Sequence, residues 1–233
     1  MIRSWIKIII SFIYIGIIAT LALISAPFKR TGNFFHKITK LFASGTLKIC
    51  GVQLNVEGTD NLDPGQHYVY ISNHASQFDI PAIIAGIPDK IRIIYKKELE
   101  KIPIFGWALK YNKIYISIDR KHGQSAIQSL EEAAEKIKKG ESVLLFAEGT
   151  RSPDGNLQPF KRGPFKLAIL SGVPVVPVTI VGSHKILPKN SLRIRSGTIT
   201  IKISEPIYSK GELGKESEID LLNRVHTAIK NNL

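Results

Sequence analysis

Short apolar runs, helical periodicities and turn residues alternate along most of the 233-residue chain. Buried strands are predicted where β-branched, aliphatic or aromatic residues follow one another, at residues 68–71, 91–95, 143–146 and 175–181. Amphipathic helices are predicted between and after these strands, at residues 124–139, 164–170 and from Ser217 onward. This alternation predicts an α/β domain with a mixed central sheet flanked by helices.

Weaker patterns indicate the remaining elements of the domain. Residues 47–56 indicate one strand or two short strands, and residues 115–118 a further strand. Isoleucines alternate with polar residues over 199–203, which predicts a half-exposed strand in a hairpin with residues 192–196. In the last helix the spacing predicts an inward face made of Ile219, Leu222, Val225 and Ile229.

An uncharged stretch from Ile8 to Phe28 precedes the domain. It is long enough to cross a bilayer, which takes about 20 apolar residues. A signal peptide is a competing interpretation, but the stretch is long and Ser25-Ala26 followed by proline is a poor cleavage site. A buried core helix is another alternative, although the stretch is apolar on nearly every face. We expect membrane insertion, either across the bilayer or within one leaflet.

Residues 33–42 follow with aromatic and aliphatic side chains on one side and His36, Lys37 and Lys40 elsewhere. This is the pattern of a basic amphipathic helix at a membrane interface. The chain is therefore expected to have a membrane-associated helix pair in residues 1–44 and an α/β domain in residues 45–233. More positive charge follows the apolar stretch than precedes it, which predicts that the domain lies on the cytoplasmic face of the membrane.

The net charge and the cysteine content limit the kinds of ligand and partner that we expect for this chain. The formal net charge is +13, which favours phosphate-bearing substrates, an anionic membrane surface or nucleic acid. Cys50 is the only cysteine, so an intrachain disulfide is excluded. The sequence has no His/Cys cluster at metal-ligand spacing, so we expect no metal site.

The strand at residues 68–71 ends at Ser72-Asn73-His74, and a helix is predicted to begin near Asp79, with Pro81 in its first turn. Residues five apart on one continuous helix point about 140° away from each other. With His74 in a loop, however, the Asp79 carboxylate can reach its ring, fix the tautomer and leave the other nitrogen as a general base. The alternatives are that Asp79 only caps the helix and that His74 is an ordinary loop residue.

A second polar loop follows the strand at residues 143–146 and contains Glu148, Gly149, Thr150 and Arg151. Glycine allows close approach of a ligand, threonine offers a hydroxyl, and the arginine fork suits a phosphate. Lys161 lies in a basic segment just before a predicted helix start, where backbone donors also favour anions. The alternatives are that Glu148 pairs with Arg151 and that the lysines form a solvated face.

These segments together resemble the glycerophospholipid acyltransferase family, and within it the 1-acyl-sn-glycerol-3-phosphate acyltransferases. The family's Asn-His, four residues, Asp block is matched by Asn73-His74 and Asp79, and its Phe-Pro-Glu-Gly-Thr-Arg-Ser block by residues 146–152. Ala147 replaces the proline, which affects loop shape more than chemistry. Residues 96–107, 115–120 and 173–178 resemble further parts of the family, so the resemblance covers roughly residues 45 to 205 in the right order.

The resemblance implies transfer of a fatty acyl group from acyl-CoA or acyl carrier protein to the sn-2 hydroxyl of 1-acyl-sn-glycerol 3-phosphate, without a further cofactor, in phospholipid biosynthesis. It implies that His74 and Asp79 are catalytic. The substrate-binding residues that we infer are Lys96, Arg120, Glu148, Gly149, Thr150, Arg151 and Lys161. For Arg120 a structural ion pair remains an open alternative.

Rival functions remain open at this point. The acceptor could be another lysophospholipid or amphiphile, since the basic residues do not fix the headgroup. A non-catalytic membrane protein that binds anionic lipid is another class, although such a protein has no need of His74 and Asp79. Nucleic-acid binding is disfavoured because the basic residues are scattered and no recognition module is apparent.

Overall fold

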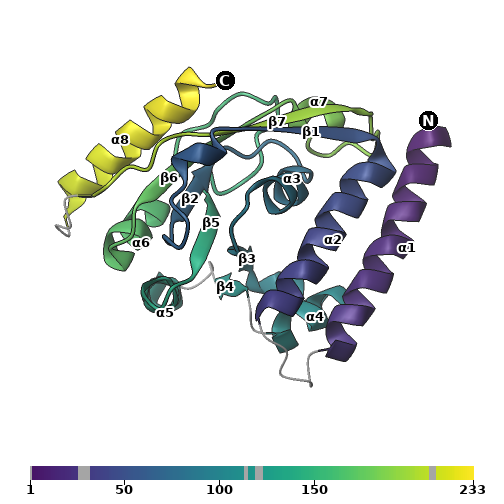
Figure 1. The fold of residues 1–233 in the computed structure, drawn as a ribbon, viewed down its shortest axis with the longest axis horizontal. Helices are drawn as coiled ribbons and strands as arrows, with labels where there is room; N and C mark the ends of the chain where they lie inside the picture. The colour runs from purple at the N-terminus through teal and green to yellow at the C-terminus, as the bar shows by residue number, and fades with distance from the viewer. Residues whose placement is uncertain (1, 26–31, 113–114, 119–122, 210–213) are drawn as a thin grey trace.

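The computed structural model describes residues 2–25, 32–112, 115–118, 123–209 and 214–233. Its strands are β1 (Val52–Glu57), β2 (Val69–Ser72), β3 (Ile91–Lys96), β4 (Ile116–Ile118), β5 (Ser142–Phe146), β6 (Val175–Val181) and β7 (Gly197–Ile203). They form a seven-stranded sheet in the order β1-β7-β6-β2-β5-β3-β4 (Figure 1). Strands β6 and β7 pair antiparallel, and the other described pairs are parallel. The predicted mixed sheet is therefore confirmed.

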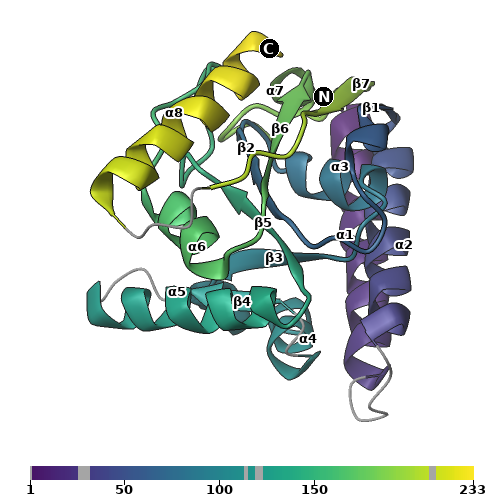
Figure 2. The same cartoon turned by 60° about the vertical axis from the view of Figure 1, so that its left-hand side comes forward.

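Helices cover both faces of this sheet (Figures 1 and 2). They are α1 (Ile2–Ser25), α2 (Gly32–Cys50), α3 (Asp79–Gly86), α4 (Phe105–Asn112), α5 (Gly123–Lys138), α6 (Gly163–Ser171), α7 (Ser183–Ile186) and α8 (Lys215–Asn231), with short 3-10 turns η2 (Thr59–Asn61) and η3 (Lys97–Lys101). One hydrophobic core lies between the sheet and α2 and α3. A second core lies between the opposite face and α5, α6 and α8.

The order of the strands brings the two predicted polar loops together. The first motif loop follows β2 and contains His74, and the second motif loop follows β5 and contains Glu148. Strand β2 lies between β6 and β5, and Ser72 at the end of β2 is in register with Phe146 at the end of β5. Because the strands are parallel, the segments that follow them leave the sheet at the same edge. His74 and Glu148 therefore start from adjacent strand ends, as is usual for ligand sites in open α/β sheets.

One prediction for the first half of the chain needs correction. Residues 47–50 were expected in a strand but belong to α2, whose buried residues Ala43, Leu47 and Cys50 continue a helical stripe into the core. Helix α2 ends at Cys50, and the next residue, Gly51, has a φ of 68°. The division of the chain at residue 44 falls inside α2 and stays a prediction.

Two further predictions fail near the C-terminus. Residues 192–196 form no strand, so the expected hairpin with residues 199–203 is wrong. Strand β7 instead pairs with β1 and β6. In α8 the inward face is shifted: Ile219 is 39% exposed, whereas Leu221 is buried with Val225 and Ile229.

Helix α4, in the middle of the chain, was not predicted, because its Phe-Gly-Trp-Ala sequence lacks a clear helical period.

Helix α1 packs beside α2 through a narrow face of small and polar residues. Its buried positions are Ser4, Ser11, Ile18, Ala19 and Ala22. The Lys7 ammonium donates to the Cys50 carbonyl at 2.6 Å, and the Tyr14 hydroxyl donates to the Leu41 carbonyl at 2.6 Å. These bonds hold α1 along α2 over several turns.

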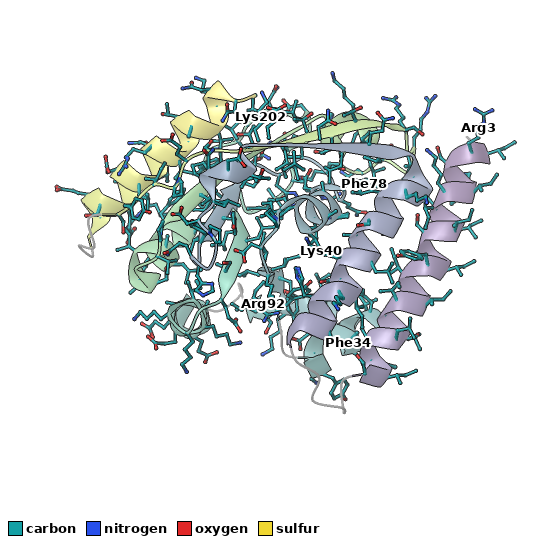
Figure 3. The ribbon with its side chains drawn as sticks, in the orientation of Figure 1. Arg3, Phe34, Lys40, Phe78, Arg92 and Lys202 are labelled. Atoms are coloured by element: carbon teal, nitrogen blue, oxygen red, sulfur yellow. The ribbon has the colours of Figure 1, made fainter. Side chains whose placement is uncertain are left out.

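The rest of α1 is apolar and exposed to solvent in the described structure. Figure 3 shows its side chains projecting away from the domain, with Arg3 near the N-terminal end. Ten large apolar side chains of this helix are exposed, namely Ile2, Trp5, Ile6, Ile9, Ile10, Phe12, Ile13, Ile17, Leu21 and Ile24. Within the described residues α1 is long and apolar enough to cross a membrane.

Candidate active site

The first motif loop is fixed to the sheet by Asn73, whose side chain is buried. Its amide nitrogen donates to the Ile180 carbonyl at 2.9 Å, and its amide oxygen accepts the Ile180 N–H at 2.8 Å. The side chain thus continues the hydrogen bonding of β2 to β6 beyond the end of β2. As a result the chain turns away from the sheet at a defined point, with His74 as the next residue.

His74 and Asp79 are in direct contact. Nδ1 of His74 lies 2.7 Å from Oδ2 of Asp79, which also accepts the backbone N–H groups of Ala75 and Ser76 at 2.8 Å. Asp79 is the first residue of α3 and is fully buried, and its carboxylate turns back onto the loop instead of capping the helix. The contact expected from the spacing is present, and the capping alternative is wrong.

This contact determines which ring nitrogen of His74 can act as a base. An ionised carboxylate only accepts hydrogen bonds, so Nδ1 carries the proton and Nε2 has the free lone pair. The ring also stacks on Phe146, with centroids 3.9 Å apart and planes inclined by 17°. With 15% of the side chain exposed, the ring is held on two sides and is still open to a substrate.

Glu148 holds the backbone of the same loop. One of its carboxylate oxygens accepts the N–H of His74 at 2.8 Å, and the other accepts the side-chain amide of Gln158 at 3.0 Å. In addition, the N–H of Ser152 donates to the His74 carbonyl at 2.7 Å. Both backbone polar groups of His74 are therefore bonded to the second motif loop. The alternative that Glu148 pairs with Arg151 is wrong, since its carboxylate contacts His74 and Gln158 instead.

The Glu148 side chain is deeply buried, with 3% of the residue exposed. This burial raises the pKa of its carboxyl from 4.5 to about 7, although the hydrogen bonds from His74 and Gln158 act to lower the pKa. The carboxyl therefore titrates near neutral pH. Gln158 was missed in the sequence, since a single glutamine in an irregular segment gives no signal of its own.

The other residues of the second loop lie beside two lysines. Gly149 has a φ of 74°, which favours glycine, and a Cβ there would lie 2.9 Å from Cε of Lys161, so the Lys161 side chain lies directly against the loop. The ammonium of Lys189 donates to the Arg151 carbonyl at 2.9 Å and to the Thr150 hydroxyl at 3.4 Å. Lys189 was not predicted from the sequence, because it follows the separate strand β6 and reaches the loop only in the folded chain.

Positive charge is concentrated at this loop. Arg151, Lys161 and Lys189 all lie on or against it, and within the described part of the chain no carboxylate forms an ion pair with the Arg151 guanidinium. An unpaired guanidinium beside a glycine turn is available to bind a phosphate.

The side chains of two predicted binding residues, Lys96 and Arg120, lie outside the described part of the structure. Lys96 ends β3 and is in register with Ile118 of β4, but its side chain lies outside the described residues. Arg120 lies outside them entirely. Their inferred role in substrate binding stays a prediction.

Comparisons with known proteins identify the family to which this fold and this histidine–carboxylate loop belong. A family model described as Acyltransferase matches residues 53–181, which run from β1 to the end of β6 and include both motif loops. A solved structure with the same fold is the 1-acyl-sn-glycerophosphate acyltransferase PlsC from Thermotoga maritima. It has a TM-score of 0.83 and 29% identity, over 99% of this chain and 93% of that one.

Similar proteins of known name show to which family of acyltransferases the chain belongs. A chloroplastic 1-acyl-sn-glycerol-3-phosphate acyltransferase of Brassica napus is 38% identical over 78% of this chain and 53% of its own length. The alpha enzyme of Mus musculus with the same name is 32% identical over 85% of this chain and 71% of its own. The chain therefore belongs to the 1-acyl-sn-glycerol-3-phosphate acyltransferase family. It spans about half the length of the Brassica napus and Arabidopsis thaliana relatives.

Proposed function

We propose that this protein transfers a fatty acyl group from a thioester, acyl-CoA or acyl carrier protein, to the sn-2 hydroxyl of 1-acyl-sn-glycerol 3-phosphate. The product is phosphatidic acid. The observation that carries the proposal is the 2.7 Å contact between His74 and Asp79 beside a loop that bears Arg151. The activity named for the plant and animal relatives supports the same reaction.

The chemistry follows from the orientation of the ring. The acceptor oxygen attacks the thioester carbonyl carbon while Nε2 of His74 removes the hydroxyl proton. Asp79 holds the ring in the required tautomer and stabilises the imidazolium that forms. The C–S bond then breaks, the new ester forms, and the imidazolium returns its proton to the departing thiolate.

Direct transfer without an acyl-enzyme is the simplest course for these residues. The hydroxyls of Ser72 and Ser76 beside His74 donate to the backbone carbonyls of Asn73 and Leu187. Cys50, the only cysteine of the chain, is buried at the end of α2, and burial raises the pKa of its thiol. A thiol of raised pKa is a poor nucleophile. A covalent acyl adduct on the protein would contradict this course.

Arg151 is proposed to bind the phosphate of the acceptor, with Lys161 beside it and with Lys96 and Arg120 as further cations. A bidentate contact from a guanidinium fits a phosphate monoester well. Gly149 and Thr150 shape this part of the site, and Lys189 holds their loop through the Arg151 carbonyl. Glu148 acts on the His74 loop, so its proposed role is positioning and not direct contact with substrate.

The acceptor and the product are membrane lipids, and the exposed apolar face of α1 supports membrane association. We propose residues 1–44 as the membrane-associated part and residues 45–233 as the catalytic domain. The excess of positive charge after the apolar stretch supports placement on the cytoplasmic face. In this arrangement the active-site edge of the sheet is held near the lipid surface.

The test is an assay with the purified full chain and a panel of lysolipids that differ in headgroup. Acyl-CoA is supplied as donor, and free thiol is measured with each acceptor. Rapid thiol release with 1-acyl-sn-glycerol 3-phosphate, and slow release with lysophosphatidylcholine or lysophosphatidylethanolamine, is the expected result. Equal rates with all headgroups would overturn the proposed acceptor, and absence of release with every acceptor would overturn the proposed activity.

A further inference from the structure

The segment between β3 and β4 exposes large apolar side chains that the proposed reaction does not use. Ile102, Ile104, Trp107 and Tyr111 are between 41% and 62% exposed. Trp107 and Tyr111 are four residues apart within α4, so they lie on one side of this helix, and Ile104 directly precedes it. We call these four residues the α4 patch. Contiguous exposed apolar residues of this size mark interaction surfaces.

The α4 patch adjoins the exposed face of α1. Ala108 of α4 packs in a small cluster with Ala19 and Ala22 of α1 and Phe35 of α2. Trp107 directly precedes Ala108 in α4, so the exposed tryptophan lies close to the residue that packs on α1. Figures 1 and 2 both show α4 beside the C-terminal half of α1. This half of α1 exposes Ile17, Leu21 and Ile24, so two neighbouring helices both expose apolar side chains.

The backbone around the α4 patch is well determined by its surroundings. Ile104 has a φ of 63°, which is unfavourable for a β-branched residue. A Cβ on Gly106 would lie 2.3 Å from the Leu99 carbonyl oxygen, so only glycine allows η3 and α4 to meet this closely. A corner built in this way presents its apolar side chains in a fixed direction.

The composition of the segment fits a lipid surface. Trp and Tyr are enriched where a protein meets the polar–apolar boundary of a bilayer. Lys97, Lys101 and Lys110 are exposed on the same segment, and lysines close to a membrane are attracted to anionic lipid. The α4 patch also lies next to the apolar helix α1, and a lipid surface is a partner that can contact both elements together.

We propose that the α4 patch enters the interface of an anionic bilayer and is a second membrane-contact surface beside α1. The inference rests on the proposed membrane association of α1. Strand β3 ends at the same edge of the sheet as β2 and β5 and leads directly into η3 and α4. Two contacts fix orientation better than one, so the α4 patch turns the edge that carries His74 toward the lipid from which the acceptor comes.

A spectroscopic experiment tests the contact itself. The chain has two tryptophans, Trp5 and Trp107, so the Trp5→Phe variant of the full chain reports on Trp107 alone. It is added to vesicles of phosphatidylcholine and phosphatidylglycerol, and binding is followed separately by sedimentation. A blue shift of the emission and protection from aqueous acrylamide are expected. Unchanged emission and quenching in the sedimented protein would overturn the inference, as would a failure of the protein to bind the vesicles.

A pair of matched variants tests the consequence for activity. The double variant Trp107→Ser/Tyr111→Ser is compared with Tyr208→Ser, because Tyr111 and Tyr208 are each 62% exposed and Tyr208 lies next to α8. Thiol release is measured with the acceptor embedded in vesicles and with a short-chain acceptor that is monomeric in solution. The rate of thiol release by the double variant is expected to fall about tenfold with the acceptor in vesicles, equivalent to about 1.4 kcal/mol. With the soluble acceptor the rate is expected to stay unchanged.

Equal activity of the double variant and Tyr208→Ser on vesicles would contradict the α4 patch while leaving the proposed reaction intact. Loss of activity with the soluble acceptor as well would also contradict it, since the effect would then not come from the membrane. Absence of thiol release from the unmodified protein would instead show that the proposed reaction itself is wrong.

Discussion

Glu148 accepts the backbone N–H of His74 at 2.8 Å, which joins the two motif loops directly. The loop that bears Arg151 therefore also fixes the position of the proposed general base. Because this bond acts on the backbone, it holds the loop while the ring of His74 remains free to contact Asp79 and Phe146. Binding of the acceptor and placement of the base thus depend on one connected structure.

The raised pKa of Glu148 predicts a pH-dependent stability. In the folded chain this carboxyl has a pKa of about 7, against an ordinary value of 4.5. The stabilising effect of its proton is complete below pH 4.5 and is lost as the pH rises through 7, because the unfolded chain ionises first. The total loss is about 3 kcal/mol, at about 1.4 kcal/mol per pKa unit.

The comparison that isolates this effect is with Glu148→Gln, which cannot ionise. Urea unfolding at pH 5 and pH 8 should show that the free energy of unfolding falls by about 2–3 kcal/mol more in the unmodified protein than in the variant. Glu135→Gln serves as the control, because Glu135 is exposed and pairs with Lys138 on the surface of α5. Parallel pH profiles for the protein and Glu148→Gln would refute the raised pKa.

Asp79→Asn is expected to lower kcat on the order of 10²- to 10⁴-fold with little change in either KM. The oxygen of Asp79 that faces Nδ1 also accepts the N–H groups of Ala75 and Ser76, so an asparagine keeps its amide oxygen there and loses the negative charge. The imidazolium that forms during proton removal is then no longer stabilised. Steady-state thiol release measures the effect. Full activity of Asp79→Asn at neutral pH would show that the charge of residue 79 does not support catalysis by His74.

Asn73→Ala should destabilise the fold by about 2–4 kcal/mol. It leaves the N–H and the carbonyl of Ile180 without their bonds to the amide, and an unsatisfied buried polar group costs about 1–3 kcal/mol. Chemical denaturation gives the free energy. Asn61→Ala is the matched control, because among the described residues the Asn61 side chain makes one bond, to the Ile203 carbonyl, so the loss of stability should be smaller. Equal losses in both variants would contradict a special role for Asn73.

Arg151→Ala should raise the KM for the lysophosphatidic acid acceptor about 10- to 100-fold and leave the KM for acyl-CoA unchanged. This range corresponds to the loss of charge-assisted hydrogen bonds of about 1.5–3 kcal/mol. Arg224→Ala on α8 is the control, since Arg224 pairs with Asp220 on the surface. A parallel rise of both KM values would indicate that Arg151 supports the loop and does not bind the phosphate.

Local patterns were sufficient to predict much of the fold. Strands β2, β5 and β6 are apolar runs bounded by turn residues, and α5 and α6 have clear boundaries in the sequence. The wrong prediction of a hairpin for residues 199–203 involves long-range pairing. Strand β7 takes its parallel partner β1 from more than a hundred residues away, and such pairing leaves no mark in the sequence next to it.

The same distinction applies to the candidate site. His74 and Asp79 are five residues apart, so a local turn was enough to predict their contact. Gln158 and Lys189 reach the second loop from irregular segments, and only the folded chain brings them there. The bond from Glu148 to the His74 backbone likewise depends on the adjacency of β2 and β5, which the strand pattern alone does not determine.

The central claim is that His74 is the base that activates the acceptor hydroxyl. The most direct test compares the purified protein with His74→Ala and with His67→Ala, using 1-acyl-sn-glycerol 3-phosphate, acyl-CoA and a thiol reagent. His74→Ala is predicted to lose on the order of 10²- to 10⁴-fold in kcat, with unchanged circular dichroism and vesicle binding, while His67→Ala stays active. A folded His74→Ala variant that releases thiol at the rate of the unmodified protein would contradict the claim.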